Sequence, residues 1–131
     1  MKKTLFICLL MFTLIGCDPG ESMEAIINNS TNKNLSIFFD SEINDFDMQL
    51  NIESNTTKEL LNFRANTGGV ILSFRDYDSI YIKDSSNEIL KVFKENTPGK
   101  NIYNVDEYWS VSEPSKNHFV YTYEITEEDF E

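Results

Sequence analysis

Residues 79–94, SIYIKDSSNEILKVFK, contain two short apolar stretches separated by a cluster of small polar residues. Ser79–Lys83 and Ile89–Lys94 are rich in β-branched and aromatic residues and alternate between apolar and polar side chains, which is typical of strands buried on one face. The four residues Asp84–Asn87 are turn formers, because their short side chains hydrogen-bond to the local backbone. The stretch therefore predicts a β-hairpin.

Similar apolar stretches recur along the chain from Glu24 onward, and we find no convincing helical pattern. The strongest stretch is 70–75, VILSFR, which is apolar on nearly both faces and is therefore expected to be a central strand. Residues 58–63 fit either a strand or one helical turn. Further strands are expected over 25–27, 35–39, 48–52, 102–111 and 119–125, with a loop over 114–117.

Roughly seven to nine short strands at regular spacing favour an all-β, antiparallel two-sheet sandwich with immunoglobulin-like architecture. A small closed β-barrel is the alternative. True immunoglobulin domains carry a Cys…Trp…Cys pattern, which this chain lacks, so only the architecture is predicted. We expect one domain over 24–131. Its end, 126–130, is expected to be a solvated acidic tail, with a single capped helical turn as the alternative.

The start of the chain has a different character from the rest. Two lysines precede an uncharged, mostly apolar run from Thr4 to Ile15, and Gly16 and Cys17 follow it. A basic start, a short apolar region and a small residue before a cleavage point are the features of an export signal. The run is shorter than the roughly 20 residues that a transmembrane helix needs. We therefore expect a cleaved signal helix over 1–16.

Leu14-Ile15-Gly16-Cys17 resembles the lipobox of bacterial lipoproteins, in which an aliphatic residue and two tolerated positions precede an invariant cysteine. The resemblance implies that Cys17 receives a thioether-linked diacylglycerol and that the chain is cut just before it. The new amino terminus would also be acylated, for example with palmitate. Two or three such acyl chains, at ~0.8 kcal/mol per buried CH₂, anchor a domain durably. Residues 17–23 would then be the lipidated cysteine and a short tether.

The Asn-, Ile- and Lys-rich chain also resembles small uncharacterised envelope lipoproteins of the Bacteroidota. That resemblance implies a place in the cell envelope, in the outer rather than the inner membrane. Asp18, directly after the lipidated cysteine, instead resembles the inner-membrane retention signal of enteric bacteria. Asp78-Ser79-Ile80 resembles the short acceptor used for O-glycosylation in Bacteroidota, which makes Ser79 a candidate for that modification.

The chain is strongly acidic, with 22 Asp and Glu residues, 11 Lys and Arg residues and a formal net charge of −11. Loss of the two lysines of the leader makes the net charge more negative still. This charge argues against nucleic acid as a partner and against electrostatic attraction to anionic lipid, so that the membrane would be reached through the lipid anchor. An acidic, tethered domain is suited to attract a basic protein. With Cys8 in the leader and Cys17 lipidated, no thiol would remain for a disulfide or for catalysis.

Motifs of known enzymes are missing from the sequence. The single histidine, His118, lies beside a predicted strand start, where a surface or capping role is expected. The sequence has no hydrolase serine motif, no zinc-binding HExxH, no phosphate-binding glycine loop and no dinucleotide fingerprint. A Ser/His/Asp set drawn from distant segments, or a pair of carboxylates as in glycoside hydrolases, stays open. We expect a non-enzymatic protein without a cofactor.

Acidic residues concentrate in one predicted loop, which makes calcium a candidate ligand. Asp40, Glu42, Asp45 and Asp47 offer the oxygen ligands that a hard cation takes. Their spacing does not match the calcium-binding helix-loop-helix motif, which needs spaced aspartates, a glycine and a closing glutamate. Solvated loop residues are the alternative interpretation, and we expect no dedicated metal site.

Aromatic residues near the C-terminus suggest a sugar-binding surface, because flat rings stack on sugar faces. Tyr108 and Trp109 are adjacent, so in a strand their side chains point to opposite faces and at most one belongs to the core. The sequence as a whole predicts a lipid-anchored envelope lipoprotein that acts as a non-enzymatic binding or interaction module. The more specific hypotheses are an acidic inhibitor or immunity lipoprotein against a basic protein, and a glycan-binding module.

Overall fold

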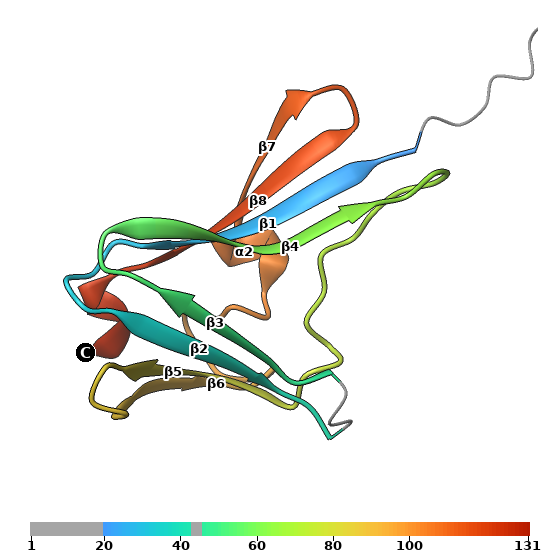
Figure 1. Cartoon of the computed structure of the whole chain (residues 1–131). Coiled ribbons are helices and arrows are strands. Elements are labelled where there is room, and N and C mark those ends of the chain that lie inside the picture. The colour runs from blue at the N-terminus through green and yellow to red at the C-terminus, as the bar shows by residue number, and fades with distance from the viewer. Residues whose placement is uncertain (1–19, 43–45) are drawn as a thin grey trace, which may run out of the picture.

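The computed structural model describes residues 20–42 and 46–131 (Figure 1). The expected signal helix over 1–16, Cys17 and Asp45 lie outside the described residues. These residues form eight strands, a four-residue helix α2 (Val105–Tyr108) and a terminal 3₁₀ helix η3 (Glu127–Phe130). The strands are β1 (Ser22–Asn29), β2 (Leu35–Asp40), β3 (Met48–Ile52), β4 (Thr56–Arg64), β5 (Ser79–Asp84), β6 (Ile89–Phe93), β7 (Ser110–Ser115) and β8 (His118–Ile125).

The strands make two four-stranded sheets, which confirms the predicted all-β, two-sheet sandwich. Sheet A has the order β4-β1-β8-β7 and sheet B the order β3-β2-β5-β6. Neighbouring strands are antiparallel except for β1 and β8, the first and last strands, which run parallel. Each sheet ends in two edge strands, so within the described part of the chain neither closes into the alternative barrel.

The hairpin predicted from residues 79–94 is confirmed as β5 and β6. The carboxylate of Asp84 holds the turn, because its Oδ1 accepts hydrogen bonds from the backbone N–H of Ser86 at 2.8 Å and of Glu88 at 3.1 Å. The Ser86 hydroxyl donates to the same oxygen, and this hydrogen bond lowers the pKa of Asp84. Asn87 has a φ of 67°, in the left-handed region that asparagine tolerates better than most residues.

The core lies between the two sheets and follows from the period-two alternation of the strands. In β1 and β2 every second side chain is buried, so each strand turns one face inward. The fully buried side chains include Ile27, Tyr123 and Ile125 of sheet A and Leu35, Ile37, Phe39, Ile80, Ile82 and Phe93 of sheet B.

The strand predicted over 70–75 is wrong. The segment alternates in burial, since Val70, Leu72 and Phe74 are buried while Ile71 is 85% exposed, but it belongs to neither sheet. It is part of the connection from β4 in sheet A to β5 in sheet B, which runs along the side where the sheets diverge (Figure 1). Its apolar side chains wedge into the core there. The Phe74 ring stacks on that of Trp109 at 5.4 Å between centroids.

Other boundaries differ from the prediction, and β1 begins at Ser22 instead of at residue 25. Of the two alternatives for 58–63, the strand is correct, as part of β4. The segment 102–111 contains the helix α2 before β7 begins, and β7 runs into the expected loop at 114–117. Among the described residues no helix has the length and apolar character needed to cross a membrane.

The expected solvated tail over 126–130 is also wrong, and the alternative of a capped turn is correct. Thr126 and Asp129 form a capping box at the start of η3, in which the Thr126 N–H donates to Asp129 Oδ2 at 2.8 Å. The same oxygen pairs with Lys100 Nζ at 2.7 Å. Phe130 is half-buried and packs against the core. This cap and this packing hold the acidic end against the sandwich.

Candidate functional site

The solvent-facing side of sheet B carries aromatic and amide side chains. Because Leu35, Ile37 and Phe39 of β2 point into the core, the residues between them point outward. The strand register places Ser36 opposite Asn51 and Lys83, and Phe38 opposite Gln49 and Tyr81. We call this surface the outer face of sheet B and define it by Ser36, Phe38, Gln49, Asn51, Tyr81, Lys83 and Val92.

Two aromatic rings lie at the centre of this face. Phe38 and Tyr81, from the neighbouring strands β2 and β5, stack with their centroids 4.9 Å apart and their planes 10° apart. The ammonium group of Lys83 lies 5.0 Å from the Phe38 centroid and 5.4 Å from the Tyr81 centroid. An aromatic pair contributes about 0.5–1.5 kcal/mol beyond its buried area, and an exposed cation over a ring about 0.5–1 kcal/mol. These contacts hold half-buried rings in a fixed place.

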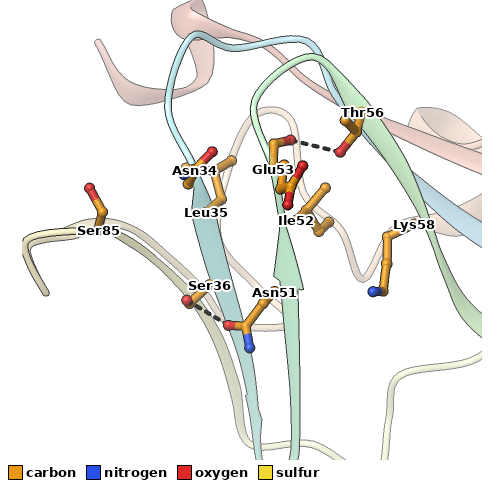
Figure 2. A pocket seen from close by; sticks show the side chains of 9 residues that line it. All are labelled: Asn34, Leu35, Ser36, Asn51, Ile52, Glu53, Thr56, Lys58 and Ser85. Carbon is orange, nitrogen blue, oxygen red and sulfur yellow. Dashed lines mark hydrogen bonds between the residues drawn. The ribbon is translucent and has the colours of Figure 1, made fainter.

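Hydrogen-bonding groups lie beside the rings. Ser36 Oγ donates to Asn51 Oδ1 at 2.8 Å, as Figure 2 shows, and Gln49 Nε2 donates to the same oxygen at 2.9 Å. Both bonds use the oxygen of Asn51, so neither occupies its NH₂ group. The face therefore combines rigid aromatic surface with neutral hydrogen-bonding groups, a composition common to binding surfaces.

Two grooves border the face. The larger, of about 590 Å³, lies beside β2, β3 and the start of β4 (Figure 2). It is lined by Asn34, Leu35, Ser36, Asn51, Ile52, Glu53, Thr56, Lys58 and Ser85. The smaller, of about 230 Å³, includes Phe38, Gln49 and Tyr81 in its lining. Asn51 and Ser36 line the larger groove and Gln49 the smaller one, so the hydrogen-bonded trio lies between them.

The structure separates the two aromatic residues that the sequence singled out. Trp109 is 5% exposed, and its indole N–H donates to the carbonyl oxygen of Ile102 at 2.9 Å. It belongs to the core and is unavailable to a sugar, because α2 ends at Tyr108 and turns the indole inward. Tyr108 is half-buried and lines a hollow of about 460 Å³ together with Tyr103. The Glu107 carboxylate raises the pKa of Tyr108 by hydrogen bonding to its hydroxyl.

Among the described acidic residues of this loop, Asp47 caps the backbone through its carboxylate, and Glu42 is held through its backbone N–H. Asp47 Oδ1 accepts a hydrogen bond from the Ser41 N–H at 2.9 Å, and the Glu42 N–H donates to Asp78 Oδ2 at 2.5 Å. Within 20–42 and 46–131 no group of three or more His, Cys, Asp or Glu residues is placed to hold a metal ion. Asp40, Glu42 and Asp47 are described and Asp45 is not, so the calcium set stays a prediction as a whole.

His118 links β8 to β1 on sheet A. Its Nδ1 lies 2.9 Å from Ser22 Oγ and its Nε2 3.7 Å from Glu24 Oε1. A catalytic histidine is oriented by a hydrogen bond to a carboxylate, and 3.7 Å is too long for one. Both contacts join neighbouring strands, and the surface or capping role expected for His118 stays a prediction. Ser79, the expected glycosylation site, is half-buried at the start of β5, and its modification stays a prediction.

Sequence reasoning missed Phe38 and Tyr81. A signal for both was present, because each is an aromatic residue at a position of an alternating strand where a polar residue is expected. Phe38 lies on the same face of its strand as Ser36, and Tyr81 on the same face as Lys83. Comparisons of the chain with protein-family models, with curated proteins and with solved structures found no match.

Proposed function

We propose that this protein is a lipid-anchored, non-enzymatic binding module of the bacterial cell envelope, held through Cys17 and binding its ligand on the outer face of sheet B. The lipobox-like end of the leader supports the anchor, and the separate resemblance to small envelope lipoproteins of the Bacteroidota supports an outer-membrane location. The observation that carries the binding surface is the stacked pair of Phe38 and Tyr81 on the solvent side of the sheet. The pair offers a ligand flat apolar surface on the solvent side of the sheet.

A glycan is the ligand class that the geometry favours. A sugar offers C–H faces that pack on aromatic rings and hydroxyl groups that exchange hydrogen bonds with amides. Gln49 and Asn51 supply such amides directly beside the rings. The groove of about 590 Å³ next to them has the size of typical ligand sites, which span roughly 300–1,000 Å³.

A basic protein is the other candidate, and it suits this face less well. The net charge of the whole chain would attract a cationic partner. On the outer face of sheet B, however, the charged group at the aromatic pair is the cation Lys83, which would repel a basic partner. An inhibitor of a basic protein would therefore need a different surface.

Titration of the detergent-solubilised, lipidated chain with peptidoglycan fragments and envelope polysaccharides tests the proposal by calorimetry. We expect one of these glycans to bind, and Phe38→Ala and Tyr81→Ala each to weaken its binding about tenfold, because central aromatic side chains carry much of the energy of an interface. Binding of a neutral glycan should change little with salt, since no net charge is neutralised.

Val111→Ala serves as the control, because Val111 is 53% exposed on sheet A. Glycan binding that the two aromatic variants leave intact would move the site away from this face. Binding of a basic protein that is lost at high salt would favour the inhibitor hypothesis. A chain that carries no lipid on Cys17 would contradict the anchor.

A further inference from the structure

The start of β1 is fixed to the rest of the fold at three successive residues. Gly20 packs so closely on the chain after β4 that a Cβ there would overlap the carbonyl oxygen of Ala65. The backbone carbonyl oxygen of Glu21 accepts a hydrogen bond from the Ala65 N–H at 2.8 Å. The side-chain carboxylate of Glu21 accepts one from the Val70 N–H at 3.1 Å. The Ser22 N–H donates to the carbonyl oxygen of Asn117 in the β7–β8 turn at 2.9 Å.

These contacts shorten the tether that the sequence suggested. Only Asp18 and Pro19 separate Cys17 from Gly20, the first residue that these contacts hold. Three residue steps span at most about 10 Å, at roughly 3.3–3.6 Å each. If Cys17 carries lipid, its Cα lies at the membrane surface, and Gly20 is then held within about that distance of the lipid headgroups.

Two large apolar side chains are exposed at this end of the molecule. Phe63 of β4 is 54% exposed and pairs with Met23, and the neighbouring Arg64 pairs with Ser22. Ile71 lies on the connection that leaves this end, is 85% exposed and directly follows Val70, whose N–H donates to the Glu21 carboxylate. It also borders a hollow that Glu95 and Tyr103 line. The start of β1, the end of β4 and the β7–β8 turn lie together at one end of sheet A (Figure 1).

We infer that this end of sheet A is a membrane-docking surface, in which Phe63 and Ile71 enter the boundary between headgroups and acyl chains of the phospholipid bilayer and Arg64 lies at the phosphate level. The inference rests on the lipidation of Cys17 proposed above. A phenyl ring and an aliphatic side chain gain free energy at that depth, and a long guanidinium side chain reaches the headgroups while its stem stays in apolar surroundings.

The occupant follows from the tether and from the charge. A bilayer is the surface that a lipid on Cys17 brings within reach of Phe63 and Ile71. The excess of acidic residues opposes approach to an anionic membrane through charge alone, so contact has to come from apolar side chains close to the anchor. Docking at this end leaves the outer face of sheet B, which belongs to the other layer of the sandwich, free for a ligand (Figure 1).

Tryptophan fluorescence tests the inference on the full, lipidated chain in vesicles of phosphatidylethanolamine and phosphatidylglycerol with brominated acyl chains. Trp109 is the single tryptophan and is buried, so it gives a constant background. We expect the added emission of Phe63→Trp to shift to shorter wavelength on binding and to be quenched by bromine. Ile89→Trp is the matched control, because Ile89 is also 54% exposed but lies on sheet B, and its emission should stay unquenched.

A spin label on Ile71→Cys gives a second reading that does not depend on packing at position 63, because Ile71 projects into solvent. Its signal should be protected from a water-soluble relaxation agent once the chain is bound to vesicles. Chains that float with the vesicles while residues 63 and 71 stay exposed to water would overturn the docking surface and leave the anchor intact. Shielding of positions 63 and 71 from water without vesicles, if it grows with protein concentration, would show instead that a second copy covers this end. A chain that lacks lipid by mass spectrometry and does not float would overturn both proposals.

Discussion

Tyr123 shows how much of the stability of this fold rests on single side chains. It is fully buried in β8, where its ring packs against Trp109 and Phe93. Its hydroxyl group has no hydrogen-bond partner among the residues that the structure describes. The ring is also covered by Lys100, whose ammonium group lies 5.3 Å from its centroid. The ring therefore stabilises the core, while its oxygen carries an uncompensated cost of desolvation.

We expect Tyr123→Phe to leave the free energy of unfolding unchanged or to raise it by about 1 kcal/mol, because the buried unpaired hydroxyl is removed and the ring is kept. Urea unfolding followed by circular dichroism measures this. Tyr103→Phe is the control, since the Tyr103 hydroxyl donates to the carbonyl oxygen of Tyr77 at 3.1 Å and its loss should cost about 1 kcal/mol. A marked loss of stability in Tyr123→Phe would show that the hydroxyl has a partner, such as a bound water.

Alkaline pH should separate the wild type from Tyr123→Phe further. Burial raises the pKa of Tyr123 above its ordinary value of 10.0, so the folded protein keeps the phenol proton at pH values where the unfolded chain has lost it. The stabilisation is complete below pH 10 and falls as pH rises, by about 1.4 kcal/mol per pH unit for this group. Tyr103, whose pKa burial raises to about 12, remains in both proteins. In urea titrations above pH 10 the variant should lose stability less steeply, and equal slopes would contradict this.

At the level of elements, two connections between the sheets are held together by a buried polar residue. Asn29, at the end of β1, donates through Nδ2 to the carbonyl oxygens of Lys33 at 2.8 Å and of Glu53 at 2.9 Å. Its Oδ1 accepts from both the N–H and the hydroxyl of Thr31. One side chain therefore ties together the β1–β2 and β3–β4 connections, both of which pass from one sheet to the other.

Asn29→Ala should lower the free energy of unfolding by about 2–4 kcal/mol, because several backbone groups lose their partner in a buried place. Asn28→Ala, one residue earlier on the solvent side of β1, is the matched control and should change it by less than about 0.5 kcal/mol. Urea midpoints at constant slope give both values. If the two variants proved equally stable, the connections would not depend on Asn29.

The connection over 65–78 gives the second prediction at this level. Phe74→Ala should cost about 3–5 kcal/mol, because it empties a site against Trp109 and Phe39 in the wedge between the sheets. Ile71→Ala, three residues earlier, should be nearly neutral, since Ile71 faces solvent. A central strand apolar on both faces would lose stability at both positions, so the difference between the variants distinguishes a wedge from a strand.

The same segment shows where sequence reasoning succeeded and where it did not. The apolar residues on both faces of 70–75 predicted a central strand, but within this segment only Val70, Leu72 and Phe74 are buried, and Ile71 is 85% exposed. Alternation placed those three side chains on one face, as it did for the buried side chains of β5. It did not reveal that 70–75 has no partner strand, since pairing depends on where the neighbouring elements lie. The parallel contact of β1 with β8 is invisible for the same reason, because it joins residues 96 positions apart such as Ser22 and His118.

The binding face was only partly within reach of the sequence. Phe38 and Tyr81 were visible as aromatic residues at polar positions of their strands, but their stacking requires the register of β2 with β5. Trp109 was a candidate for the surface until α2 proved to interrupt the expected strand and turn the indole inward. The lipid anchor on Cys17 remains a prediction from the sequence, since that residue lies outside the described part of the chain.

For the molecule as a whole, the excess of acidic residues is the main electrostatic property. The chain has 22 acidic and 11 basic residues, and the ion pairs between described residues are Lys100 with Asp129 and, when the imidazole is protonated, His118 with Glu24. Most carboxylates therefore repel one another across the surface. Folding brings them closer together than they are in the unfolded chain, so repulsion lowers the free energy of unfolding.

Salt should stabilise the protein, because the screening length falls from about 30 Å at 0.01 M to about 10 Å at 0.1 M ionic strength. Urea is a denaturant without charge. In urea unfolding experiments, the free energy of unfolding should rise as sodium chloride is added. Magnesium and calcium chloride at equal concentration should raise it equally, since screening depends on ionic strength and not on the identity of the cation. A specific extra stabilisation by calcium would instead mean that Asp40, Glu42, Asp45 and Asp47 form a cation site. Substitution of Asp47→Asn would then remove the calcium effect and leave the effect of magnesium, whereas general screening would be nearly the same in this variant.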